Sequence, residues 1–190
     1  MRWRVEHRTV VTSTMDVAAA LAVAGAPAGT VVVADEQTAG RGQHGRVWTA
    51  PAGTCLLFTA ILRPPLRSIQ SPDLTRRVAE RIAQAVREVA EIRPGIKGPN
   101  DIMVADRKLA GVLLQTSIRG QSLEYLLVGV GLNVNLTEVE LPLPTATSLL
   151  VVTGRRHDRD RLLRAILRSF EALDELLPAP ASGSGPTDVT

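Results

Sequence analysis

Residues 95–134, GIKGPNDIMVADRKLAGVLLQTSIRGQSLEYLLVGVGLNV, contain the densest succession of extended segments in the chain. Apolar and β-branched residues gather at about 95–98, 101–105, 108–118 and 122–134, and this grouping predicts four strands. The turns Ala105-Asp106-Arg107 and Arg119-Gly120-Gln121 are each typical of a hairpin connection. Because hairpins join antiparallel neighbours, the segment predicts a mixed, largely antiparallel sheet.

The rest of the chain supplies helices and further strands. Strands are expected at 3–11, 30–34 and 55–62. A first helix starts from an N-cap at Thr12 or Ser13, and apolar periodicity predicts two more helices at about 73–91 and 158–177. The fold class is therefore α+β, a sheet packed with helices in one domain over residues 1–177. Residues 178–190, rich in Pro, Ala, Ser and Gly, read as a flexible tail.

Composition narrows the classes of protein that fit. Hydrophobic residues make up 45% and charged residues 22% of the 190, which is ordinary for a globular protein. The single cysteine, Cys55, cannot form an internal disulfide, and we expect a reducing, cytoplasmic location. No apolar run is long enough to span a membrane. Despite a net charge of +3, no basic stripe interleaved with aromatic residues indicates a nucleic-acid partner.

The first motif that carries chemistry is the loop Gly40-Arg41-Gly42-Gln43-His44-Gly45-Arg46-Val47-Trp48. Its glycines allow backbone N–H groups to approach an anion, and its arginines supply positive charge. The loop satisfies G-x-G-x-x-G, but a dinucleotide-binding turn must open a helix. Pro51 and Gly53 follow too closely for a helix of more than one turn, so we reject that interpretation.

The second motif is Lys97-Gly98-Pro99-Asn100-Asp101, followed by Lys108-Leu109-Ala110-Gly111. It places an amide, a carboxylate and two ammonium groups along one short stretch. Lys97 and Lys108 are the only lysines in a chain that otherwise uses arginine. A retained lysine suggests that a compact point charge is needed, as it is beside a phosphate.

These motifs, together with Val128-Gly129-Val130-Gly131-Leu132-Asn133-Val134-Asn135, occur in an order and at spacings that resemble those of biotin protein ligases. Ser13-Thr14 and Gln37 match two further family positions. The resemblance covers about residues 8–177, the catalytic domain of that family, and it implies the family's class II synthetase-like fold. Lipoate and octanoyl transferases share that fold but lack the Gly-Arg-Gly loop.

The resemblance implies a two-step ligase reaction. Biotin and Mg-ATP would give biotinyl-5′-AMP and pyrophosphate, and the acyl group would then pass to a lysine of a biotin carboxyl carrier domain, as in acetyl-CoA carboxylase. Activation needs cations and N–H donors to press two anions together, and it needs no protein nucleophile. This agrees with the lack of a convincing Ser/His/Asp or Cys/His arrangement in the sequence.

The resemblance also assigns roles to residues. Arg41 and Lys108 would be catalytic. Lys108 would neutralise the carboxylate and the α-phosphate, Arg41 would wrap the acyl-phosphate junction with Gly40 and Gly42, and Asp101 would help to position Mg²⁺. The expected biotin-binding residues are Ser13, Thr14, Gln37, Gly40, Arg41, Gly42, Lys108 and Gly111. The expected nucleotide-binding residues are Arg46, Trp48, Asn100 and Asn133.

Simpler interpretations stand beside these roles. Ser13 and Thr14 could be no more than a helix N-cap, which spacing alone favours. Asn133 could lie in a turn, and Trp48 could be a lone surface aromatic. Gly129 and Gly131 could mark a β-bulge.

Three residues depart from the family pattern. Gln43 stands where an arginine that retains the adenylate is usual, so a leakier intermediate is expected. Gly98 replaces a tryptophan, so the acyl pocket would be enlarged or filled by a neighbour. Gln115 stands where a glutamate is more usual.

Two parts that occur in members of the family are not expected here. No C-terminal β-barrel cap and no N-terminal DNA-binding segment are expected, and the resemblance admits a homodimer. Alternatives are a ligase for lipoate or another acid, and a non-catalytic paralogue that binds biotin or its adenylate.

Overall fold

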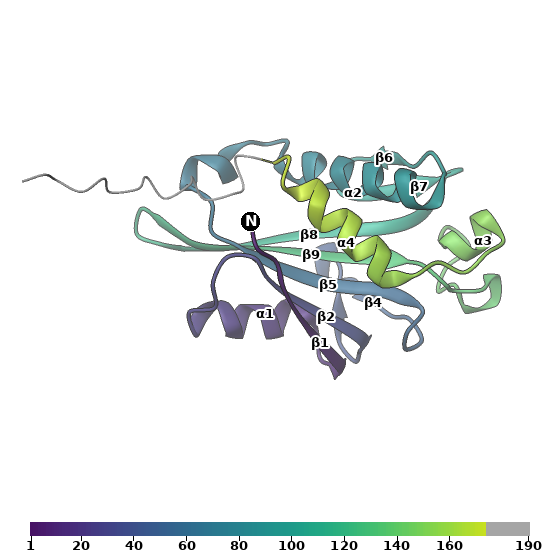
Figure 1. Cartoon of the computed structure of the whole chain (residues 1–190), viewed down its shortest axis with the longest axis horizontal. Helices are drawn as coiled ribbons and strands as arrows, with labels where there is room; N and C mark the ends of the chain where they lie inside the picture. The colour runs from purple at the N-terminus through teal and green to yellow at the C-terminus, as the bar shows by residue number, and fades with distance from the viewer. Residues whose placement is uncertain (174–190) are drawn as a thin grey trace, which may run out of the picture.

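The computed structural model describes residues 1–173 (Figure 1). The expected tail at 178–190 lies outside the described residues. The strands are β1 (Arg4–Val11), β2 (Thr30–Gln37), β3 (Gly40–Arg41), β4 (Val47–Trp48), β5 (Cys55–Leu62), β6 (Gly95–Lys97), β7 (Asp101–Val104), β8 (Arg107–Arg119) and β9 (Ser122–Asn133). The α-helices are α1 (Thr14–Val23), α2 (Leu74–Ala90), α3 (Leu149–Thr153) and α4 (Arg159–Phe170). Short 3-10 turns are η1 (Gln43–Gly45), η2 (Leu66–Gln70) and η3 (Glu138–Glu140).

Seven strands form one sheet in the order β1-β2-β5-β9-β8-β7-β6. Only β1 and β2 pair in parallel, because α1 carries the chain between them as a crossover. Every other pair in this sheet is antiparallel. The mixed, largely antiparallel sheet expected from the sequence is confirmed.

The two faces of the sheet bury different helices (Figure 1). Phe58 and Leu56 of β5 point into the main core, which α2 and α4 cover. Ile61, from the alternate positions of the same strand, packs instead with Met15 and Ala18 of α1. Cys55 and Leu57 of the same face pack without α1, so this helix covers the second face only in part.

The isolated hairpin β3–β4 occupies part of that open area. Gly40 pairs with Trp48, and Arg41 pairs with Val47. The glycine motif, which was expected only as a loop, is thus a short hairpin with η1 at its tip. Trp48 packs beside Cys55 and Leu57 of β5, which places the hairpin on the same face as α1.

Two boundaries differ from the sequence expectation by more than one residue. Strand β2 continues past residue 34 to Gln37, and this extension carries Gln37 to the edge of the open face. The last helix was expected to reach residue 177 but ends at Phe170, followed by tight turns whose N–H groups bond three residues back. Leu173 is still buried, so the apolar pattern outlasts the helix. Residues 174–177 lie outside the described residues.

The segment between β9 and α4 was not assigned in advance. It contains η3 with a capping box between Thr137 and Glu140, and α3 with Ser148 as N-cap and Gly154 in the left-handed region. Within residues 1–173, no helix has the length and apolarity needed to cross a membrane.

Candidate active site

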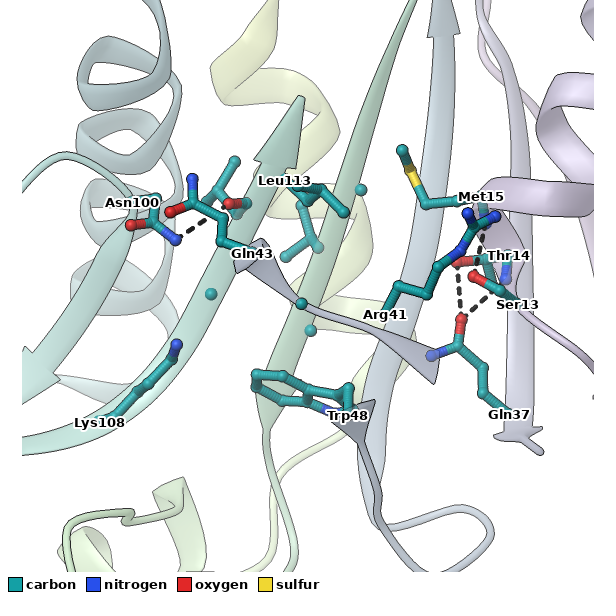
Figure 2. A pocket seen from close by; sticks show the side chains of 16 residues that line it. Ser13, Thr14, Met15, Gln37, Arg41, Gln43, Trp48, Asn100, Lys108 and Leu113 are labelled. Atoms are coloured by element: carbon teal, nitrogen blue, oxygen red, sulfur yellow. Dashed lines mark hydrogen bonds between the residues drawn. The ribbon is translucent and has the colours of Figure 1, made fainter. Parts of the chain in front are cut away.

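A cavity lies between the hairpin β3–β4 and the open face of the sheet, and we call it the inner chamber (Figure 2). The start of α1, the end of β2, the hairpin, and the middle of β8 and β9 form its walls. The predicted site residues that line it are Ser13, Thr14, Gln37, Arg41, Gly42, Trp48, Asn100, Lys108 and Gly111. Segments far apart in the sequence therefore meet in one place.

At one end of the inner chamber, which we call the neutral end, uncharged side chains are linked by a chain of hydrogen bonds. The buried hydroxyl of Thr59 donates to Thr14 Oγ1 at 2.9 Å, and the Thr14 hydroxyl donates to Gln37 Oε1 at 3.0 Å. The backbone N–H of Thr14 donates to the same Gln37 oxygen at 2.7 Å. Figure 2 shows the Gln37 side chain held in this way. Because its carbonyl is taken, the amide N–H groups of Gln37 are the part that remains to bind a ligand.

Ser13 at the same end serves two purposes. It is the N-cap of α1, with extended backbone (φ −156°), and its hydroxyl oxygen accepts a hydrogen bond from Met15 N at 3.3 Å. The hydroxyl hydrogen of a capping serine stays available as a donor. Ser13 also lines the inner chamber. The N-cap interpretation is confirmed, and it does not exclude a binding role.

The other end of the inner chamber is charged. Lys108 Nζ lies 2.6 Å from Asp101 Oδ1, and both side chains are partly buried. The same ammonium lies 5.9 Å from the centre of the Trp48 ring, within the range of a cation–π contact. Figure 2 shows Arg41 directed towards Met15 and Thr14, away from Lys108. Arg41 thus lies at the same end as Thr14 and Gln37, but its charge is paired with Asp16.

The backbone of Lys108 is fixed from both sides. Lys108 N donates to Thr145 O at 2.7 Å, and Thr147 N donates to Lys108 O at 2.8 Å. Its neighbour Arg107 donates to Ala146 O at 2.7 Å and pairs with Glu138 at 2.6 Å. The segment after β9 therefore determines where the Lys108 side chain begins.

Two glycines of β9 form the floor of the chamber. A Cβ on Gly129 would lie 2.6 Å from Met15 Sδ, and a Cβ on Gly131 would lie 2.7 Å from Trp48 Cε2. Both residues keep regular pairing with β5 and β8. The bulge interpretation is wrong, because the register shift of this hairpin lies at Ser117 and Ile118. The glycines instead let large side chains lie flat on the sheet.

The hairpin has a similar close approach at Gly40. A Cβ at this position would lie 2.4 Å from Trp48 O and 2.8 Å from Gln37 Nε2. Any other residue would push β3 away from β4 and disturb Gln37. Gly40 itself lines the second cavity described below, not the inner chamber.

The inner chamber is narrow, with a volume of about 50 Å³. Pockets that hold small molecules usually measure roughly 300–1,000 Å³. The sheet that forms the floor is held by continuous ladders, whereas the hairpin has only two pairs of residues. A ligand of ordinary size therefore requires the hairpin or Trp48 to move.

A second cavity of about 580 Å³, the outer chamber, adjoins the inner chamber and shares Met15, Arg41, Gly42 and Leu113 with it. Arg41 lines both chambers, and Asp16 and Arg46 line the outer one. Arg41 forms an ion pair with Asp16 in the first turn of α1. The arginine expected at the reacting atoms is thus held by a carboxylate at the junction of the two chambers.

Asn133 lies outside both chambers. It is buried in β9, its Nδ2 donates to Thr147 O at 2.9 Å, and its Oδ1 accepts from the Cys55 thiol at 3.4 Å. The interpretation of Asn133 as a turn residue is wrong. Burial raises the pKa of the Cys55 thiol to about 12, so Cys55 stays a neutral core residue and not a nucleophile. Trp48 is only partly exposed, so it is not a lone surface aromatic.

Metal-ligating side chains do not gather in the described residues. No group of three or more His, Cys, Asp or Glu in residues 1–173 is arranged to hold an ion. Asp101, the expected Mg²⁺ ligand, lies outside the chamber lining and pairs with Lys108. Mg²⁺ is often held by one or two carboxylates together with substrate phosphates. Asp101 therefore fits an ion that arrives with a triphosphate, not one that stays in a protein cage.

The three departures from the family pattern occupy different places. Gln43 lines the inner chamber, and Figure 2 shows it near Asn100 and Leu113. Gln115 is exposed and lines the outer chamber. Gly98 is exposed and lines neither, and a Cβ there would meet no atom within 4 Å. A small side chain would fit at Gly98, and the effect of this glycine on the acyl pocket stays a prediction.

Sequence reasoning missed three residues of the site. Met15 was taken only as part of the helix, although it follows Ser13-Thr14 directly and lines both chambers. Thr59 is the one hydroxyl residue in the otherwise apolar strand Cys55–Leu62, which was the available signal. Asp16 could be identified only from the position of Arg41 in three dimensions.

The sequence is similar to those of known protein ligases. Residues 8–133 match the model of the Biotin/lipoate A/B protein ligase family. The bifunctional ligase/repressor BirA of Bacillus subtilis (strain 168) is 37% identical over 168 residues, which cover 87% of this chain and 52% of that protein. A biotin–[acetyl-CoA-carboxylase] ligase of Mycobacterium tuberculosis is 32% identical over 148 residues, covering 76% and 53%. The chain spans about half the length of these relatives.

A solved structure agrees. The biotin protein ligase from Aquifex aeolicus in complex with biotin and ATP superposes with a TM-score of 0.76 at 30% identity. The match covers 89% of this chain and 69% of that one.

Proposed function

The chain belongs to the biotin/lipoate A/B protein ligase family, and from this premise we propose that it is a biotin–protein ligase. In the first step biotin and Mg-ATP give biotinyl-5′-AMP and pyrophosphate. In the second step the acyl group passes to a lysine of a biotin carboxyl carrier domain, with release of AMP. The relatives named as biotin ligases and the ATP complex support this reaction.

The observation that carries the proposal is that the two ends of the inner chamber offer different chemical groups. Its neutral end offers amide N–H groups of Gln37 and the hydroxyl of Ser13, which suit the carbonyl oxygen of a ureido ring. Its other end offers the ammonium of Lys108, which suits a carboxylate and a phosphate. Biotin carries a ureido ring at one end and a carboxylate at the other. An aliphatic acid would leave the donors at the neutral end unpaired, at a cost of about 1–3 kcal/mol.

The chemistry of activation is charge neutralisation. A biotin carboxylate oxygen attacks the α-phosphorus, a P–O bond to the α-phosphorus forms, and the bond to the bridging oxygen breaks as pyrophosphate leaves. Lys108 would leave Asp101 and neutralise the two anions as they approach. Arg41 would leave Asp16 and assist at the acyl phosphate, with the glycine N–H groups nearby. Removing one such preorganised donor typically costs about 100- to 1,000-fold in rate.

The nucleotide would lie beyond the acyl group, over β9. Trp48 would stack on or cover adenine, and Asn100, which lines the same chamber as Lys108 and Gln43, would contact the phosphates or ribose. Arg46 would approach phosphate from the outer chamber. Asn133 would act indirectly, by holding Cys55 and the 145–147 backbone behind Trp48. Asp101, released by Lys108, would face the Mg²⁺ that enters with ATP.

A second acid-activating function remains the alternative, because the family includes lipoate ligases. The neutral end favours biotin over lipoate or octanoate. The test is pyrophosphate release from Mg-ATP with biotin, lipoate and octanoate in parallel. Release with biotin alone is expected. Release with lipoate or octanoate instead would transfer the function to the alternative, and binding of biotin without release would indicate a non-catalytic paralogue.

A further inference from the structure

Thr59 is a polar residue in a strand that is otherwise built for packing. Strand β5 buries all of its side chains, and Thr59 is the only one of them with a hydroxyl group. Thr59 is fully buried and lines neither chamber, so a ligand in either chamber does not touch it. A valine would fill the same space and would suit a strand at least as well. The hydroxyl group therefore needs a reason other than packing.

The only hydrogen-bond partner of the Thr59 hydroxyl within residues 1–173 is Thr14 Oγ1, at 2.9 Å. The Thr59 proton lies on that bond, since leaving it unpaired among apolar side chains would be costly. A hydroxyl oxygen that accepts a bond from one side keeps its own hydrogen for another acceptor. The hydrogen of Thr14 is thus directed to Gln37 Oε1, which lies 3.0 Å away. Thr59 sets the direction of the whole chain of hydrogen bonds.

This direction decides which side of the Gln37 amide faces the inner chamber. The backbone N–H of Thr14 donates to the same Gln37 oxygen at 2.7 Å, so Oε1 accepts two bonds. If the amide were reversed, its NH₂ group would meet that N–H, and the Thr14 hydroxyl would lose its acceptor. Two donors on one carbonyl also polarise the amide, which makes its N–H groups stronger donors to a ligand.

Thr59 lies at the neutral end of the inner chamber. In the sheet it pairs with Gly129, above which Met15 lies. Trp48 lies over Gly131, which pairs with Leu57 of β5. The hydroxyl of Thr59 is therefore linked to the neutral end and not to the residues expected to hold the nucleotide.

We infer that Thr59 is a positioning residue for the acid. Acting through Thr14, it holds the N–H groups of Gln37 towards the inner chamber and so determines how tightly a ring carbonyl is bound. The inference deepens the proposed function and rests on it, because it takes the neutral end as the site of the ureido ring. The effect of Thr59 is confined to the affinity for the acid.

The experiment compares Thr59→Val, which removes the hydroxyl, with Thr59→Ser, which keeps it. For Thr59→Val, the Kd of biotin measured by calorimetry without nucleotide should rise by about fivefold. The KM for biotin in pyrophosphate release should rise equally, while kcat and the KM for ATP stay within about twofold of the wild type. Thr59→Ser should restore both biotin values to within about twofold of the wild type.

Thr30→Val is the matched control. Thr30 in β2 is buried, its hydroxyl donates to Pro27 O at 2.9 Å, and it lines neither chamber. Its replacement removes a buried threonine hydrogen bond of the same kind, so thermal unfolding can show a similar loss of stability. The Kd of biotin should nevertheless match that of the wild type.

A double variant tests whether Thr59 acts through Gln37. Once Gln37→Ala has removed the amide, adding Thr59→Val should change the Kd of biotin by less than about twofold. Two independent effects would instead multiply, to about fiftyfold for the double variant.

Three results would overturn the inference while the proposed function stands: Thr59→Val binds biotin as the wild type does, Thr59→Ser is as weak as Thr59→Val, or the effects of Thr59→Val and Gln37→Ala multiply. An equal rise in the KM for ATP would also overturn it, because the effect would then be on the fold. A wild type that binds biotin without releasing pyrophosphate would overturn the ligase function alone. A wild type that binds no biotin would overturn both.

Discussion

The two ends of the inner chamber are built in opposite ways. At the neutral end, Thr59, Thr14 and Gln37 form a continuous chain of hydrogen bonds between two strands and a helix. At the charged end, Lys108 is anchored through its backbone, while its ammonium rests on Asp101 and faces Trp48. One end is fixed before a ligand arrives, and the other must exchange partners when it does.

The difference suits the two tasks that the proposed reaction sets. A neutral ring is recognised by donors that are already oriented, since unpaired polar groups are costly when buried. A carboxylate and a phosphate carry their own charge, so they can displace Asp101 from a lysine that waits in a partly exposed pair. The neutral end should therefore control which acid binds, and the charged end should control the rate of activation.

The largest effect is expected from Lys108→Ala. Loss of the ammonium should reduce the rate of biotin-dependent pyrophosphate release by about 100-fold or more, whereas the KM for biotin should change much less. Lys97→Ala is the control, because Lys97 is the only other lysine and is exposed outside both chambers. Equal rates for Lys108→Ala and the wild type, measured under saturating substrates, would remove Lys108 from the mechanism.

Gly131→Ala tests the position of Trp48. A Cβ would lie 2.7 Å from the Trp48 ring and force it off the floor of the chamber. If Trp48 stacks on adenine, the KM for ATP should rise by about thirtyfold, while the KM for biotin changes less. Gly95→Ala is the control, since a Cβ on Gly95 meets no atom within 4 Å. A larger change in the biotin constant than in the ATP constant would place Trp48 against the wrong substrate.

Gln37→Ala should weaken the neutral end. The KM for biotin should rise by about tenfold, because the ring carbonyl loses its amide donors. The KM for ATP should stay near its wild-type value. Gln84→Ala, on the exposed surface of α2, controls for loss of an amide elsewhere. Should Gln37→Ala raise both constants together, its effect would be on the fold and not on the acid.

Gln43→Arg is expected to have the smallest effect. Gln43 lines the inner chamber near Asn100, so an arginine there would add a cation beside the adenylate phosphate. The release of biotinyl-5′-AMP from the enzyme should slow by about threefold, measured by trapping the free intermediate with hydroxylamine. An unchanged release rate would mean that Gln43 does not make the site leaky.

The sheet could be predicted because its signals are local. Hairpin turns at Ala105–Asp106 and Gly120, with left-handed backbone at each, fix the pairing of β7, β8 and β9. The end of α4 could not be predicted, because Leu173 continues the apolar pattern into a turn that only tertiary packing selects.

The candidate site could be predicted in part. Ser13, Gln37 and Lys108 were identified from motif order, and the structure brings them around one chamber. Thr59 and Asp16 could not be found in this way, because each matters through a neighbour that is remote in sequence. Arg41 was expected at the acyl-phosphate junction, and in this structure its side chain pairs with Asp16 and is directed away from Lys108.

The most direct test of the two-ended chamber is a crystal structure of the protein with a non-hydrolysable analogue of biotinyl-5′-AMP. The account predicts the ureido oxygen within hydrogen-bonding distance of Gln37 Nε2 or Ser13 Oγ, and the phosphate within that distance of Lys108 Nζ. An analogue bound with its ring beside Lys108, or with its phosphate beside Gln37, would contradict it.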